Sequence, residues 1–160
     1  GHWASFSGPS GGKTGFGGEL SLPILPVAIG ASYLDSSYTL PTFTGFSGGT
    51  MTGAIIPVYV ALKLGVPLFP ISLGLEGGYT IATAASGGTT LAIPGGAYYA
   101  INAYYSFPII PSINLWAAAG YSNLLLDLKA AVTSAGGSSA SVSNLDFSGM
   151  SYKLGATLGL

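Results

Sequence analysis

Few residues of this chain are of a type that performs catalysis. The 160 residues include one histidine, His2, and no cysteine. A serine nucleophile needs a neighbouring general base, which is usually a histidine. Segment 45–49, of sequence GFSGG, matches the G-x-S-x-G pattern of a nucleophile elbow, but no histidine follows it and no strand-to-helix setting surrounds it. We therefore predict that the protein is not an enzyme and that this segment is a flexible loop.

Metal, cofactor and nucleic-acid sites are equally poorly supported. Without cysteine there are neither thiolate ligands nor disulfides. Asp35, Asp127 and Asp146 lie near the ends of alternating segments, where a calcium ion or a cation bridging lipopolysaccharide would find carboxylates, but such residues are usually only solvated. Four basic residues are too few for a nucleic-acid surface. We predict no metal, no cofactor and no nucleic-acid partner.

The remaining charges indicate ion pairing. Lys63 and Glu76 fall on the small, polar side of two neighbouring alternating segments, so we expect them to pair. Glu19 and Lys153 lie on an early and a late segment, which barrel closure would bring together, and we expect a second pair there. The predicted interior polar network consists of Glu19, Lys63, Glu76, Lys153, Asn102 and Asn114.

Alternation of period two runs through most of the chain and indicates β-strands with one apolar face. Val58 and Val60, for example, alternate with Tyr59 and Ala61. Three apolar turns bounded by prolines, at 23–26, 67–70 and 108–111, join successive alternating segments. Proline donates no N–H and is best tolerated where strand pairing stops. The predicted strands are 2–7, 14–23, 26–35, 55–67, 70–83, 97–107, 111–125 and 147–160.

Composition indicates that the apolar face meets lipid. Hydrophobic residues make up 49% of the chain and charged residues 6%, against about 25% charged in a typical soluble domain. A lysine on a lipid face at mid-membrane costs roughly 2–4 kcal/mol, which favours placing the charges inside. No stretch of about 18 apolar residues is free of proline and charge, so closed strands rather than a helix are expected to cross the bilayer.

We therefore predict one all-β domain over residues 1–160, a transmembrane antiparallel up-and-down β-barrel of eight strands. The proline turns would form the short periplasmic side. Longer extracellular connections, rich in Gly, Ser and Thr, would run over 36–54, 84–96 and 126–146. The interior would be filled by inward aromatics, although the many inward glycines would leave space. These lumen-filling aromatics are Tyr98, Tyr104 and Trp116.

Outward aromatic residues fall at two levels of the predicted barrel. Tyr33, Tyr79 and Tyr121 lie at similar distances beyond the proline turns, as an interfacial belt requires. Tyr99 reaches the same level from a descending strand, and Phe107 belongs to a lower ring. The alternative is that aromatic residues simply favour strands, which explains their type but not their height.

The chain combines short turns, long outer loops, dyad alternation and an apolar last strand, MSYKLGATLGL over 150–160. In this combination it resembles the small eight-stranded outer-membrane β-barrels of bacteria, of the porin-like membrane-anchor kind. Such barrels commonly end in Phe, whereas this chain ends in Leu160. The resemblance implies a location in the bacterial outer membrane, with lipid as the surrounding partner. It also implies a mature form that lacks its signal peptide.

Several functions fit this prediction. A filled lumen favours a structural, anchoring or scaffold role; a partly empty lumen would pass water or small apolar solutes. A different class, a β-rich subunit of an extracellular filament or sheath, would cover its apolar faces with other copies. A designed barrel and, last, a soluble sandwich are further alternatives. The low charge of loops 36–54 and 84–96 also predicts that they contact another envelope protein or their own barrel.

Overall fold

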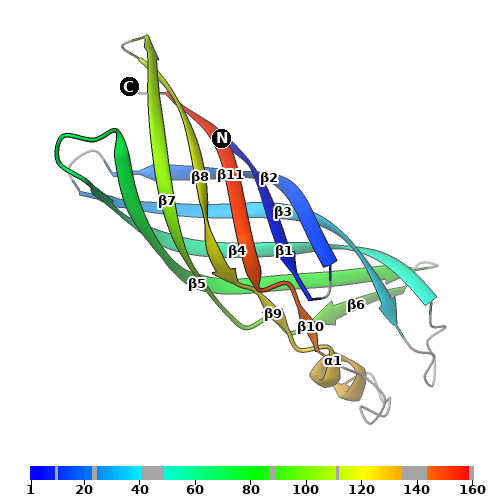
Figure 1. Ribbon diagram of the computed structural model, residues 1–160. Helices are drawn as coiled ribbons and strands as arrows, with labels where there is room; N and C mark the ends of the chain where they lie inside the picture. The colour runs from blue at the N-terminus through cyan, green and yellow to red at the C-terminus, as the bar shows by residue number, and fades with distance from the viewer. Residues whose placement is uncertain are drawn as a thin grey trace.

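Alternating apolar and small residues give the chain long antiparallel strands, and these strands close into a barrel (Figure 1). The computed structural model describes residues 1–9, 11–22, 25–40, 49–86, 89–110, 112–134 and 144–158. Its elements are β1 (His2–Gly8), β2 (Gly11–Ser21), β3 (Val27–Leu40), β4 (Gly49–Gly65), β5 (Ile71–Ser86), β6 (Thr89–Ile93), β7 (Ala97–Ile110), β8 (Ile113–Asn123), β9 (Leu125–Leu126), α1 (Leu128–Ser134), β10 (Leu145–Asp146) and β11 (Gly149–Leu158).

Eight strands form the closed sheet, in the order β1, β2, β3, β4, β5, β7, β8 and β11, with β11 paired back to β1. All of these pairings are antiparallel. Strand β6 pairs with the last part of β5, beyond the residues that pair with β7. The predicted all-β, eight-stranded antiparallel barrel is therefore confirmed, including the short first strand.

The strands are strongly staggered around the barrel. From Ala4, the register partners lead across β2 and β3 to Ile55 on β4. In the other direction, across β11, β8, β7 and β5, they lead to Gly65 on the same strand. The two positions differ by about ten residues, and eight strands with this stagger tilt by roughly 40–45° from the barrel axis.

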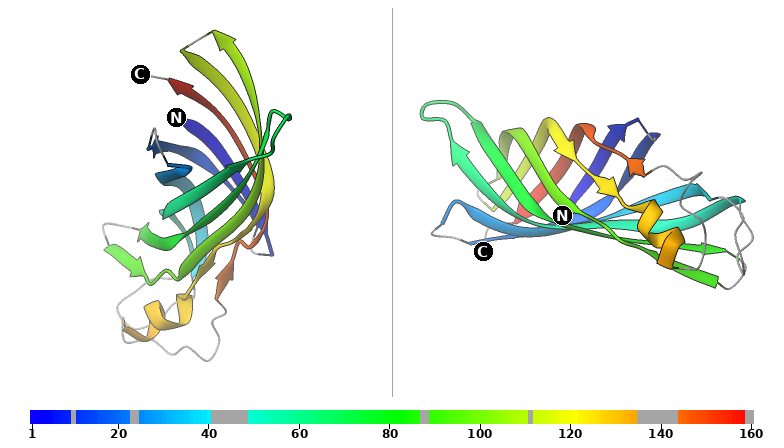
Figure 2. Two further views of the ribbon diagram at one scale, coloured as in Figure 1. Left: turned by 90° about the vertical axis from the view of Figure 1, so that its left-hand side faces the viewer. Right: turned by 90° about the horizontal axis from the view of Figure 1, so that it is seen from below.

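The two ends of the barrel differ. At the end that we call the turn end, Gly1 lies beside the last residues of β11, and the turn at 67–70 joins β4 to β5. At the opposite end, the cap end, β3, β4, β5 and β6 reach beyond the shorter strands, and α1 lies beside them (Figure 2). The fold therefore has a short apolar rim at one end and a projecting sheet with a cap at the other.

The expected long loops are wrong in extent. Much of 36–54 and 84–96 is strand, because β3 continues to Leu40, β4 begins at Gly49, and β5 pairs with β6. The Ser- and Thr-rich composition resembled a loop, yet threonine is β-branched and fits a paired strand. The segment 126–146 contains α1, β10 and the last residue of β9, which pairs with β10. The third proline turn is also shorter than expected, because β7 continues through Pro108 with an irregular register.

Leu68 is the one non-glycine residue with a positive φ in the described part of the chain, at 70°. A left-handed backbone costs an L-residue with a full side chain about 1–2 kcal/mol, and asparagine tolerates it better. The Leu68 side chain is fully exposed, so no packing inside the protein explains its retention.

We expect Leu68→Asn to raise the free energy of unfolding by about 1 kcal/mol, because it relieves this backbone strain. Urea unfolding in detergent micelles, followed by tryptophan fluorescence, measures the change. Phe69→Asn is the matched control, since the backbone of Phe69 itself is not left-handed. An equal gain in both variants would show that polarity, and not strain, is responsible.

Candidate functional site: the barrel interior

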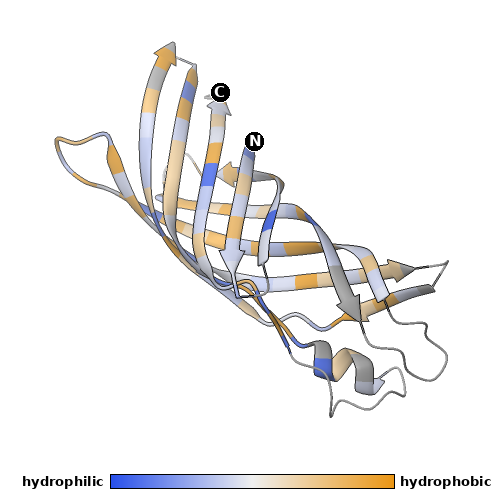
Figure 3. Cartoon of the chain, turned by 45° about the vertical axis from the view of Figure 1, so that its right-hand side comes forward, coloured by the Kyte–Doolittle hydropathy of each residue, from blue (hydrophilic) through white to orange (hydrophobic). Residues whose placement is uncertain are grey.

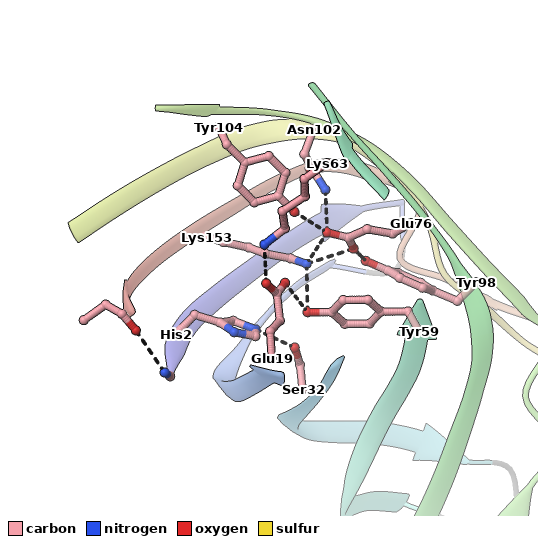
Figure 4. A network of polar contacts seen from close by, with 12 residues as sticks. His2, Glu19, Ser32, Tyr59, Lys63, Glu76, Tyr98, Asn102, Tyr104 and Lys153 are labelled. Carbon is pink, nitrogen blue, oxygen red and sulfur yellow. Dashed lines mark hydrogen bonds and ion pairs between the residues drawn. The ribbon is translucent and has the colours of Figure 1, made fainter. Parts of the chain in front are cut away.

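A buried carboxylate, Glu76 on β5, is the centre of the interior (Figure 4). The Lys153 ammonium donates to both carboxylate oxygens, at 2.7 and 2.8 Å. Three residues of β7 also donate to it: the hydroxyls of Tyr98 and Tyr104, at 2.7 and 2.6 Å, and the Asn102 amide, at 2.9 Å. A buried charge is tolerated when it is paired and its lone pairs are hydrogen-bonded, and Glu76 meets both conditions.

A second group, around Glu19 on β2, lies beside the first. The Lys63 ammonium forms an ion pair with Glu19, and the Tyr59 hydroxyl donates to the same carboxylate at 2.9 Å. Lys153 also contacts the Tyr59 hydroxyl, at 3.3 Å, and so joins the two groups. Two carboxylates and two ammonium groups therefore form one network whose formal charges cancel.

The predicted ion pairs form between the expected residues but with the partners exchanged. Lys63 pairs with Glu19 and not with Glu76, and Lys153 pairs with Glu76 and not with Glu19. Adjacent strands are not enough for a contact, because Lys63 lies opposite Gly74 in the β4–β5 register, and Glu76 is two residues further toward the cap end. The tilt of the strands brings residues from more distant strands to the same level along the barrel axis, and this common level decides which charges pair.

Inward glycines make room for the network's aromatic rings. A Cβ placed on Gly30 would lie 2.7 Å from the Tyr59 ring, and one on Gly74 would lie 2.3 Å from Tyr104. Tyr59 thus crosses β3 above Gly30 to reach Glu19 on β2. Gly155 has the same relation to Trp116, at 2.4 Å. The expectation that inward glycines leave space is therefore wrong at these three positions, where a neighbouring ring occupies the space.

The predicted lumen-filling aromatics all lie inside the barrel. Tyr98 and Tyr104 are buried, and Trp116 is 9% exposed. The Tyr104 and Trp116 rings lie 5.6 Å apart, and the Lys63 ammonium lies 4.6 and 5.2 Å from their centroids. Tyr59, which sequence reasoning had not chosen as a lumen-filling residue, is as deeply buried as Tyr98. The sequence did contain a signal for this position, because Tyr59 alternates with the outward Val58 and Val60 and so must point into the barrel.

The cap end is closed by apolar packing that the sequence analysis missed. Leu124, Leu126 and Phe147, from the connection between β8 and β11, are buried, as is Ala131 of α1. They belong to one cluster with inward residues of the barrel, among them Phe6, Leu34, Met51, Ile55 and Ile93. The described parts of this connection, 124–134 and 144–147, therefore pack against the barrel interior at the cap end. The alternation of Leu124 and Leu126 was the signal in the sequence.

Asn114, the remaining predicted network residue, makes no side-chain contact with the two carboxylates. It lines a cavity of about 420 Å³ at the turn end, together with Lys63, Trp116 and several hydroxyl side chains. We call this cavity the vestibule. The interior thus has three levels: an apolar core at the cap end, the charged network in the middle, and the vestibule at the turn end.

The outer surface has the opposite character. The predicted girdle residues all point outward and are about half exposed, namely Tyr33, Tyr79, Tyr99, Tyr121 and Phe107. Between the tyrosines and the turn end, exposed apolar side chains alternate with inward-facing ones along the strands. The hydropathy of the residues varies along these strands (Figure 3). Beyond Tyr33 and Tyr121 toward the cap end, the next outward residues are Asp35 and Asn123. An apolar belt therefore ends at a ring of tyrosines.

One histidine–serine contact and no metal-binding cluster are found among the residues that the structure describes. The described histidine, His2, is buried, and its Nε2 contacts the Ser32 hydroxyl at 2.9 Å. Ser47 lies outside the described residues. The described residues contain no cluster of His, Cys, Asp and Glu side chains able to hold a metal ion. No helix in the described ranges is long and apolar enough to span a membrane.

Comparisons of this chain with models of protein families, with curated proteins and with solved structures gave no match.

We expect Glu76→Ala to lower the free energy of unfolding by about 3–5 kcal/mol, because it leaves the Lys153 ammonium buried without its carboxylate. The double variant Glu76→Gln with Lys153→Met removes both charges and should recover most of this loss. Urea unfolding in micelles measures both. Glu19→Gln should cost less, because its partner Lys63 has a side chain that is 26% exposed. A double variant no more stable than Glu76→Ala would contradict the interpretation.

Proposed function

We propose that this protein is an integral β-barrel of the bacterial outer membrane with a structural, anchoring or scaffold role. The observation that carries the proposal is the inversion of the usual pattern: two ion pairs lie inside the barrel, and large apolar side chains lie outside it. Leu20, Leu73 and Ile101 are each more than half exposed, whereas Lys153 and Glu76 are buried. Monomeric soluble proteins rarely expose a continuous apolar surface of this kind.

The shape of the apolar surface further supports a bilayer as its partner. With the tilt given above, a residue rises about 2.4 Å along the barrel axis, so about ten residues cover the apolar band of an outer-membrane barrel, about 25 Å tall. The outward residues of β5 run from Ile71 at the turn end past Thr83 to Ala85, with Tyr79 near the boundary of the apolar part. Tyrosine rings are enriched at membrane interfaces because one end is apolar and the other polar.

The filled interior favours an anchor over a pore. Eight strands leave an interior that side chains just fill, and here Tyr59, Tyr98 and Lys153 are fully buried at its middle. The apolar core at the cap end blocks the lumen at a second level, beyond the charged network. In this proposal the turn end faces the periplasm, and the projecting strands within 36–54 and 84–96 present a threonine-rich surface to another envelope protein.

Lysine substitutions on one face of one strand test the membrane location. In phospholipid vesicles, we expect Leu73→Lys to lower the free energy of unfolding by about 2–4 kcal/mol, and Thr83→Lys, outside the proposed apolar band, by at most about 1 kcal/mol. Both side chains point outward from β5. Heat-dependent gel mobility and protease protection report folding. Equal costs at both positions would contradict a bilayer around this surface. Failure to enter vesicles, with assembly into large particles, would favour the filament subunit.

Planar-bilayer recording tests the choice between anchor and pore. We expect the refolded protein to be silent, without discrete conductance steps, because the charged network and the apolar core both block the lumen. Discrete steps that change in Lys63→Ala or Glu76→Ala would instead favour a narrow polar pore. The same preparation must show heat-dependent mobility, so that silence is not the result of failed insertion.

A further inference from the structure

The vestibule contains polar side chains that the barrel itself does not use. Five of them line it, each from a different strand: Ser21, Ser72, Ser106, Asn114 and Thr157. Within the described part of the chain, none of these five side chains forms a hydrogen bond. The other levels of the interior hold apolar contacts and the charged network, together with three buried hydroxyls that have no hydrogen-bond partner, those of Ser36, Thr80 and Ser122. The vestibule differs from these levels because its unpaired hydroxyl and amide groups line a hollow that a ligand can enter.

The charge of the vestibule is balanced. The ammonium of Lys63 reaches it, but Glu19 pairs with this lysine. An anionic ligand would therefore meet a cation that is already neutralised, and a cationic ligand would meet no free carboxylate among the lining residues. Hydroxyl and amide groups both donate and accept hydrogen bonds, as the hydroxyl groups of a neutral ligand also do. The Trp116 and Tyr104 rings add an aromatic wall beside these polar groups.

Apolar residues surround the mouth of the vestibule. Pro70 lines it directly, and the neighbouring Phe69 is 64% exposed. Ile109, near the end of β7, and Leu115 on β8 are also exposed. This rim continues the outer apolar belt without a charged residue in the described turn 67–70. A ligand that carries an apolar chain would place that chain on the rim and its polar group in the vestibule.

We propose that the vestibule binds a neutral polyhydroxylated group, supplied either by a free sugar or by the headgroup of a glycolipid. The cavity, at about 420 Å³, lies within the range of about 300–1,000 Å³ that is usual for small-molecule sites. The apolar rim favours the lipid-borne form. This inference rests on the proposed function, because the lipid reaches the rim only if the barrel lies in a bilayer.

Trp116 lines the vestibule and so reports its occupancy. In a Trp3→Phe variant, refolded into phosphatidylcholine vesicles, Trp116 is the remaining tryptophan. The probes are octyl β-glucoside, at amounts that leave the vesicles intact, and methyl β-glucoside, which has the same sugar without the chain. Octyl phosphocholine is the matched control for the chain. We expect a saturable change in Trp116 emission with octyl β-glucoside and none with octyl phosphocholine.

Substitutions in the lining identify the groups involved. Ser72→Ala and Asn114→Ala should each weaken binding of octyl β-glucoside between about twofold and tenfold, the effect of one lost hydrogen bond. Thr83→Ala, outward on β5 and away from the vestibule, should leave binding unchanged. Saturation by methyl β-glucoside at similar concentrations would identify a free sugar as the ligand. Saturation only by octyl β-glucoside would identify a lipid headgroup.

The outcomes separate this inference from the proposed function. A barrel that folds in vesicles but shows no saturable change, or shows the same change with octyl phosphocholine, overturns the inference and leaves the anchor proposal standing. A chain that does not enter vesicles overturns the anchor proposal. Methyl β-glucoside titrated into the barrel folded in micelles then tests the vestibule alone, and the absence of saturation there overturns the inference as well.

Discussion

The pairing of the first strand, β1, with the last, β11, closes the sheet, and every other feature of the barrel follows from this closure. An open sheet of these strands would leave two edges of unpaired N–H and C=O groups, which hydrocarbon does not tolerate. Closure gives each of the eight strands two neighbours and separates the side chains into an inner and an outer set. Alternate residues of each strand therefore have different environments: one set lies inside the barrel, and the other set faces the surroundings.

The interior of such a barrel is narrow, and it is filled by complementary choices on adjacent strands. Where one strand presents a large ring, the next presents a glycine, as Tyr59 does above Gly30 and Tyr104 above Gly74. The rings carry hydroxyl groups that satisfy the two carboxylates. The glycines and the charged network therefore depend on each other. The glycines give the tyrosine rings room to reach the carboxylates, and the tyrosine hydroxyls allow the carboxylates to be buried.

The two ends of the molecule are built for different surroundings. At the turn end the apolar belt continues into proline turns whose described residues are exposed and apolar, and the polar groups retreat into the vestibule. At the cap end the outer face becomes polar and the interior becomes apolar. In the proposed membrane location this asymmetry orients the barrel, with the projecting sheet outside the bilayer and the vestibule opening near the opposite interface.

The strand phase, the closed all-β barrel and the inward direction of Glu19, Lys63, Glu76 and Lys153 could be predicted from the sequence alone. These follow from a period of two and from composition, both of which are local properties. Three features could be known only from the folded chain: Lys63 pairs with Glu19, Tyr59 joins the network, and Leu124, Leu126 and Phe147 pack into the cap end. Such contacts join strands distant in the chain, and they depend on the tilt that a stagger of about ten residues imposes on eight strands. No single strand encodes that stagger, because it is the sum of the registers around the whole barrel.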